Sequence, residues 1–230
     1  MKLEMRILGI DTSSPKGSIA ITLRNKIISE KAISGHTSYS KNLFFIIDSI
    51  LQDSNLNISQ VDAFAVSIGP GSFTGLRVGL SSVLGFSLAQ KKPVFSIETL
   101  LAMAHTIPFT ENIICPVIDA RKGELYTSFF KYDANGQICR LEEDRTVKPE
   151  LLVNVINKTT LFFGSGVETY GKVLSQKLGN LAVFDNGSSN TTAASVAKLA
   201  FEKTQNGEKT DSTLLKPKYV RRSEAEMNLN

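Results

Sequence analysis

Short apolar runs bounded by turn residues alternate with stretches of helical spacing along the first half of the chain. Continuous apolar runs predict buried strands, and apolar residues at every third or fourth position predict amphipathic helices. The predicted elements are strands at 7–10, 18–23 and 26–33, a helix at 40–53, a strand at 63–68, a helix from about 74 to 90, a strand at 94–97 and a helix at 98–106. Tight turns between the first three strands predict an antiparallel meander.

The second half of the chain repeats this order. The predicted elements are strands at 113–118, 125–132 and 137–141, a helix at 149–156, a strand at 160–163 and helices at 168–178 and 192–203. The order β-β-β-α-β-α therefore occurs twice in outline, with a break near 108–112, which is the pattern of an α/β protein. The predicted division is an N-terminal lobe at 1–108 and a C-terminal lobe at 109–230, which includes a polar linker at 205–213 and a disordered tail.

Composition excludes several classes of protein. With 42% apolar and 21% charged residues over 230 positions, the chain is neither a disordered polar tail nor a collagen-like fibre. The net charge of +4 is spread along the chain, so it favours anionic partners mildly without indicating a nucleic-acid-binding block. Cys115 and Cys139 fit neither a disulfide framework nor a zinc site. Without an 18-residue apolar run or a signal-peptide pattern, the expected location is the cytoplasm, away from membranes.

A glycine-rich turn lies between the strand at 63–68 and the following helix. Its backbone N–H groups and the helix dipole could hold an anion. However, the segment lacks the Gly-Lys-Ser/Thr of a phosphate-binding P-loop, and Pro70 removes one N–H. Gly71, Gly75 and Gly79 recur every four residues, so they leave one side of the helix bare for a close approach of another backbone. That backbone could belong to a second protein chain or to the same chain.

The helix at 40–53 carries more apolar residues than one face can hold, because Phe44 and Phe45 widen its stripe. Together with the bare glycine side of the next helix, this predicts two helices that cover their own sheet and also contact a partner. The candidate interface residues are Leu43, Phe44, Ile47, Leu51, Gly71, Gly75, Arg77, Gly79, Leu80 and Val83. A deeply buried helix pair within the chain is the alternative.

Few residues are candidates for chemistry. Asp11 and Thr12 follow the first strand, where their oxygens could hold a metal and a nucleotide's phosphates, or could simply form a turn. Asp119 lies at the matching point of the second lobe, with a turn carboxylate paired with Arg121 or Lys122 as the alternative. Ser72 lacks the flanking glycines of a nucleophile elbow. We therefore predict no catalytic residue.

The two histidines give no metal site, because neither has a cysteine or carboxylate neighbour at ligand spacing. His36 lies in a predicted turn. His105 lies at the carboxyl end of a predicted helix, where the dipole would favour a partly charged imidazole.

Four segments resemble the TsaB (YeaZ) family, the bacterial tRNA threonylcarbamoyladenosine biosynthesis subunit. They are Ile7-Leu8-Gly9-Ile10-Asp11-Thr12-Ser13, the run from Ser67 to Gly79 with its Gly-Pro-Gly-Ser-Phe-Thr-Gly-Leu-Arg core, 93–99, and the run from Val117 to Tyr126. The resemblance implies an ASKHA (actin and sugar-kinase-like) fold, with two ribonuclease-H-like lobes of mixed sheets flanked by helices.

The resemblance also implies a non-catalytic relative of TsaD, the subunit that transfers threonylcarbamoyl to the tRNA adenosine beside the anticodon. The two metal-binding histidines of TsaD are replaced here by 98–103, and Gly164-Ser165-Gly166 is only loosely similar to an adenosine-binding loop. No cofactor or metal is expected, apart from ATP or ADP at a subunit junction.

The implied partners are a TsaD-like catalytic subunit, a TsaE-like ATPase that joins at the junction, a second copy of the chain when it is alone, and tRNA through the complex. The helices near 43–51 and 74–86 are implied as the contact surface.

Two other functions stay open from the sequence. One is an enzyme of the same superfamily, either an ATP-dependent phosphotransferase that uses Asp11 and Asp119 or a peptidase-like protein. The other is a tRNA-binding module with basic residues that include Lys216, Lys218, Arg221 and Arg222.

Overall fold

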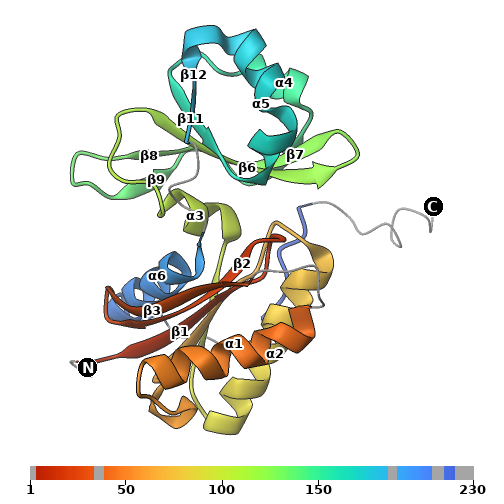
Figure 1. Ribbon diagram of the computed structural model, residues 1–230. Coiled ribbons are helices and arrows are strands. Elements are labelled where there is room, and N and C mark those ends of the chain that lie inside the picture. Colours follow the sequence, from red (N-terminus) through yellow and green to blue (C-terminus); the bar gives the residue numbers. More distant parts are fainter. Residues whose placement is uncertain (1–3, 34–38, 186–190, 209–214, 221–230) are drawn as a thin grey trace. The chain divides into compact units, whose positions relative to one another are not determined.

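The computed structural model describes residues 4–33, 39–185, 191–208 and 215–220, which form two units (Figure 1). The first unit contains the described residues of Met1–Ala102 and Asn190–Pro217, and the second contains those of Met103–Ser189 and Lys218–Asn230. Each unit has its own mixed sheet with flanking helices. The predicted α/β class with two similar lobes is confirmed.

The sheet of the first unit has the strand order β3-β2-β1-β4-β5. Its strands are β1 (Arg6–Asp11), β2 (Gly17–Leu23), β3 (Lys26–Ile33), β4 (Ala63–Ser67) and β5 (Val94–Ile97). The first three strands pair antiparallel, as the tight turns predict, and β4 and β5 continue the sheet parallel to β1. The carboxyl end of β1 therefore lies beside the carboxyl end of β4, where the glycine-rich turn begins.

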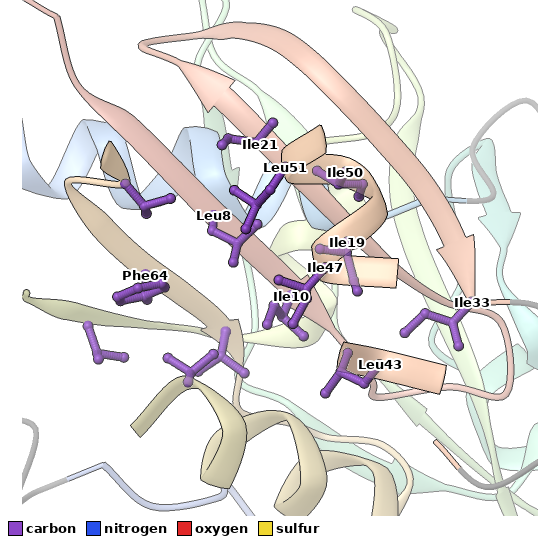
Figure 2. Close-up of a cluster of buried hydrophobic side chains, with 14 of the residues drawn as sticks. Leu8, Ile10, Ile19, Ile21, Ile33, Leu43, Ile47, Ile50, Leu51 and Phe64 are labelled. Carbon is purple, nitrogen blue, oxygen red and sulfur yellow. The ribbon is translucent and has the colours of Figure 1, made fainter. Parts of the chain in front are cut away.

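Helices cover both faces of this sheet. One face carries α1 (Tyr39–Asp53) and α2 (Phe73–Gln90), and the side chains of Leu8, Ile10 and Phe64 are buried there among helix residues (Figure 2). The other face carries α6 (Ala193–Gln205), which packs on Ile7 and on the alanines of β4. Alternation of side chains along each strand separates the two sets.

The position of α6 differs from the sequence-based division, which assigns all of 109–230 to the second lobe. Ser18 Oγ accepts hydrogen bonds from the backbone N–H groups of Thr192 (3.1 Å) and Ala193 (3.0 Å), and Glu30 Oε1 accepts one from Ala194 (3.1 Å). These bonds satisfy the free N–H groups at the start of α6. The helix is therefore part of the first unit, although it follows the second along the chain.

The sheet of the second unit has the order β10-β7-β6-β11-β12, and the β8–β9 hairpin also pairs with β6. Its strands are β6 (Ile113–Arg121), β7 (Glu124–Thr127), β8 (Phe130–Tyr132), β9 (Ile138–Arg140), β10 (Arg145–Val147), β11 (Thr160–Phe163) and β12 (Ala182–Phe184). The single strand predicted at 125–132 is divided because Thr127 and Ser128 bond to other segments: Thr127 Oγ1 donates to Pro116 O, and Ser128 Oγ donates to Glu142 O. The short strands β10 and β12 are not predicted.

Two helices pack on one face of the second sheet. They are α4 (Pro149–Val153) and α5 (Ser165–Leu178), and their Leu152 and Leu174 are fully buried among strand residues such as Phe162. The short helix α3 (Thr99–Ala104) follows β5, and one-turn 3₁₀ segments lie at Ile58–Gln60 and Gly179–Leu181. Within the described parts of the chain, none of the helices has the length and apolar character needed to cross a membrane.

Candidate protein-binding surface

The glycine side of α2 packs against the turn between β1 and β2 of the same unit. A Cβ atom added to Gly71 or Gly75 would come closer than 3.0 Å to the backbone oxygen of Ser13 or Thr12, respectively. A Cβ on Gly79 would come equally close to Thr12 Oγ1. The prediction that these glycines contact a partner is wrong, because the chain's own backbone occupies the space that they leave.

Thr12 and Ser13 hold this turn against the start of α2, and Asp11 bonds within the turn. Thr12 Oγ1 donates a hydrogen bond to Gly75 O (2.8 Å), and Ser72 N donates to Ser13 O (2.6 Å). Asp11 Oδ1 accepts a bond from Ser13 N (2.9 Å), which is the turn geometry that the sequence left as an alternative. All three residues are buried. The polar atoms that suggested a nucleotide site thus contribute to the packing of the first unit.

Most of the predicted apolar interface residues belong to the core of the first unit. Leu43, Ile47, Leu51, Leu80 and Val83 are buried against its sheet (Figure 2 labels the first three). Their assignment to a partner interface is wrong, because apolar periodicity identifies the helix face that turns to the sheet. Of the predicted interface set, Phe44 and Arg77 are exposed.

Exposed apolar side chains lie on the outward sides of α1 and α2. Phe44 is 51% exposed, Phe45 is 76% exposed and Leu88 is 74% exposed. The two helices meet where the Phe44 ring lies 5.8 Å from the Phe86 ring, centre to centre, in an edge-on arrangement. Phe86 in turn stacks on the buried Phe64 at 5.7 Å. We call the set Phe44, Phe45, Arg77, Ser81, Gly85 and Leu88 the α1–α2 surface.

Small and charged residues complete the α1–α2 surface. Ser81 and Gly85 are exposed on α2, and a Cβ added to Gly85 would meet no atom within 4 Å. The Arg77 guanidinium stands 3.7 Å from the centre of the Phe73 ring. Sequence reasoning missed Ser81, Gly85 and Leu88. The sequence feature that could have identified them is the spacing 77, 81, 85 and 88, because residues at this spacing share the side of α2 opposite to the buried glycines.

Asp119 in the second unit forms a turn. Its Oδ1 accepts a hydrogen bond from Arg121 N (2.8 Å), and its Oδ2 accepts one from Thr169 Oγ1 (3.4 Å). Gly164 and Gly166, which suggested an adenosine loop, lie where an added Cβ would come closer than 3.0 Å to Val117 O and to the Leu125 side chain, respectively. These glycines allow the start of α5 to pack on the second sheet.

The proposed basic residues near the carboxyl terminus do not form one group in the described structure. Lys216 is exposed, whereas Lys218 Nζ lies 3.1 Å from Asp144 Oδ2. Arg221 and Arg222 lie outside the described residues, as do His36 and residues 209–213 of the predicted linker. Among the described residues, no three His, Cys, Asp or Glu side chains are grouped so that they could hold a metal ion.

His105 follows α3 and is partly buried. Burial lowers the pKa of its imidazole to about 4, the opposite of the charged state that the helix dipole was expected to favour. In the unfolded chain the pKa is about 6.5, so only the unfolded state gains a proton between pH 6.5 and 4. The stability of the fold with a neutral His105 is therefore fully present above pH 6.5. The unfolding free energy then decreases as the pH falls from 6.5 toward 4.

His105→Gln should reduce the acid sensitivity of folding. Because the substitution removes this proton uptake, the loss of unfolding free energy between pH 7 and pH 5 should be smaller than in the wild type by about 2 kcal/mol. Denaturant unfolding at the two pH values measures the difference. Equal pH dependence of wild type and variant would contradict a neutral imidazole in the folded protein.

Cys115 lies in the core of the second unit. Burial raises the pKa of its thiol to about 12, although Thr127 Oγ1 lies 3.2 Å from the sulfur and opposes that rise. Because the thiolate is the reactive form, we expect a thiol reagent to label the partly exposed Cys139 first and to reach Cys115 only on unfolding. Mass spectrometry of the two tryptic peptides checks this order. Labelling of both cysteines at equal rates would contradict it.

Comparison with known proteins agrees with this architecture. The family model for TsaD, tRNA N6-adenosine threonylcarbamoyltransferase, matches residues 26–229. The chain is 26% identical to the tRNA threonylcarbamoyladenosine biosynthesis protein TsaB of Bacillus subtilis over 96% of both chains. It is 33% identical to the protein of the same name in Haemophilus influenzae, over 76% of this chain and 78% of that one.

A solved structure shows the same fold. YeaZ from Pseudomonas aeruginosa superimposes with a TM-score of 0.79 at 22% sequence identity and covers 94% of this chain and 99% of its own. The likeness confirms the predicted fold class. With the family model and the relatives, it shows that the chain belongs to the TsaB (YeaZ) family, within the larger family that the TsaD model describes.

Proposed function

We propose that this chain is a non-catalytic accessory subunit for the threonylcarbamoyl modification of the tRNA adenosine beside the anticodon. Its relatives are named for tRNA threonylcarbamoyladenosine biosynthesis, which supports a role in that pathway. In this proposal the chain binds a TsaD-type catalytic subunit through the α1–α2 surface and stabilises its active arrangement. The observation that carries the proposal is the exposure of Phe44, Phe45 and Leu88 on adjoining helices.

Burial of these side chains would stabilise a complex. Removing the exposed part of each from water contributes about 1–2 kcal/mol, and clustered apolar residues of this kind mark interaction sites. On α2 itself, Ser81 and Gly85 are exposed positions without long side chains, so a partner helix could approach closely. Arg77 would then lie at the polar edge of the contact.

The candidate groups for chemistry support an accessory role. Asp11 and Thr12 are engaged in bonds that hold the first unit together, and both carboxylate oxygens of Asp119 accept hydrogen bonds in a turn. Asp11 and Thr12 are also buried, so a nucleotide could contact them only if the β1–β2 turn moved. We therefore propose that ATP or ADP binds, if at all, at the junction with the catalytic subunit.

The further partners in this proposal are a second copy of the chain, a TsaE-like ATPase and tRNA. Without its catalytic partner, the chain is expected to bury the α1–α2 surface against a second copy of itself. A TsaE-like ATPase would join the heterodimer, and tRNA would be bound by the complex.

Calorimetric titration tests the proposal. The isolated chain should bind a TsaD-type subunit of the same organism and show no tight binding of ATP with magnesium. Tight ATP binding by the isolated chain, lost in Asp11→Asn while the unfolding transition is kept, would favour the phosphotransferase alternative. No heat of binding with the TsaD-type subunit at micromolar concentrations would contradict the accessory role.

A further inference from the structure

Five described residues other than glycine have a left-handed backbone, with φ between 51° and 63°. They are Arg24, Asn55, Lys91, Arg121 and Lys122. Glycine and asparagine hold this conformation at a lower cost than long side chains do. Four of the five are nevertheless basic, and all five are exposed. The backbone conformation alone therefore gives no reason for a basic residue at these positions.

Two of these residues lie in turns at the same end of the first sheet. Arg24 is in the β2–β3 turn, and its N–H donates a hydrogen bond to Met5 O (2.9 Å), next to the start of β1. Lys91 ends α2 just before β5, and Phe64 N donates to Pro93 O (2.9 Å) at the start of β4. With neighbouring strands about 4.8 Å apart and the order β3-β2-β1-β4-β5, the two turns lie on the order of 15 Å apart.

Each of these turns carries two cations. Lys26 follows Arg24 closely, and Lys92 follows Lys91. Arg24, Lys26 and Lys91 are exposed, and Lys92 is partly exposed. We call these four residues the basic turns. The charge that is spread along the sequence is thus gathered by the fold into two pairs at one end of the first unit.

Carboxylates at this end of the first unit are largely engaged or buried. Asp62 Oδ2 accepts a hydrogen bond from the backbone N–H of Arg6 (2.8 Å). The last turn of α6 lies at this end too, because α6 starts at the opposite end beside Ser18. There Glu208 pairs with a lysine (2.7 Å), and burial raises the pKa of Glu202. With Glu4 exposed, the balance of exposed charge remains positive.

We propose that the basic turns contact the phosphate backbone of the tRNA that the complex binds. This inference rests on the proposed function, which brings tRNA to the assembly. Lysine and arginine contacts to phosphates position a nucleic acid without reading its sequence, and two pairs of cations on the order of 15 Å apart can reach several phosphates. A left-handed backbone at a basic residue fits such a role, because binding sites commonly hold costs of this kind.

The other basic pair with a left-handed backbone, Arg121 and Lys122, does not share this role. It lies in the β6–β7 turn, where Arg121 is paired with Glu124 across the turn and its N–H donates to Asp119 Oδ1 (2.8 Å). The two carboxylates balance the charge of this pair locally.

Anisotropy of a fluorescent tRNA transcript, titrated with the complex of this chain and a TsaD-type subunit, tests the contact. The variant Lys26→Gln with Lys91→Gln removes one cation from each of the basic turns. Lys131→Gln with Lys172→Gln is the matched control, because it removes two exposed lysines of the second unit. In the variant, the dissociation constant should rise about tenfold, and the slope of log affinity against log salt should become shallower by about 1.5–2. The control should keep both wild-type values.

Calorimetric titration of each chain with the TsaD-type subunit separates this inference from the proposed function. If the wild-type chain formed no complex, the proposed function would fail and the tRNA contact with it. If the complex formed and the variant bound tRNA with wild-type affinity and salt slope, the tRNA contact alone would be overturned. Equal losses in the control would also overturn it, as would weaker binding of the TsaD-type subunit by the variant, which would indicate a protein contact instead.

Discussion

Gly75→Ala should lower the unfolding free energy by about 3 kcal/mol, at the upper end of the cost of overpacking a well-packed site. The new methyl group would come closer than 3.0 Å to Thr12 O, which is backbone and cannot rotate away. Relief requires α2 to move from the β1–β2 turn, and that movement strains the bond from Thr12 Oγ1 to Gly75 O. For a chain of this length, the midpoint of thermal unfolding should fall by about 6–12 °C.

Gly85→Ala is the matched control on the same helix. No atom lies within 4 Å of the added methyl group, and alanine is the better helix former by about 0.5–1 kcal/mol, so the midpoint should rise slightly. Scanning calorimetry of the two variants measures the difference. If Gly75→Ala melted at the wild-type temperature, the close packing of α2 on the β1–β2 turn would be wrong.

Phe45→Asp should weaken binding of the TsaD-type subunit by at least about a hundredfold, as expected for an aromatic anchor at the centre of an interface. The Phe45 side chain is 76% exposed in the isolated chain, so the substitution leaves the core of the first unit unchanged. In the complex it would place an unpaired carboxylate in an apolar contact, which costs far more than the lost ring contacts alone. Calorimetric titration gives the two affinities.

Phe109→Asp provides the control for this loss of affinity. Phe109 is 68% exposed but lies in the second unit, outside the α1–α2 surface, so its substitution should leave the affinity unchanged. Equal affinities of wild type and Phe45→Asp would contradict the proposed surface. Equal losses in both variants would also contradict it, because the effect would not be specific to α1 and α2.

The sequence predicts the helices and strands better than it predicts which part of the protein packs against each of them. The spacing of Leu43, Ile47 and Leu51 correctly identifies α1 and its buried face. The same spacing cannot say whether the face meets a sheet of its own chain or a partner, because both contacts require the same apolar side chains. Phe44 and Phe45 are more informative, since one face of the helix cannot bury them together with the stripe.

The glycines show a second limit of the sequence. Their four-residue spacing correctly indicates that a backbone approaches α2, but it does not identify that backbone. The residues that fill the space are Thr12 and Ser13, about 60 positions earlier, and they come into contact through the pairing of β1 with β4. The assignment of α6 to the first unit could not be predicted for the same reason. Its bonds to Ser18 and Glu30 join residues more than 160 positions apart.

Side-chain footprinting of the complex would show whether the TsaD-type subunit covers the α1–α2 surface. Carbene labelling followed by mass spectrometry would compare Phe44, Phe45 and Leu88 in the free chain and in the complex with the TsaD-type subunit, with Phe109 as an internal reference. Labelling of the first three residues should fall severalfold in the complex, while that of Phe109 should be unchanged. Labelling of Phe45 and Leu88 at the same level in both samples would contradict it.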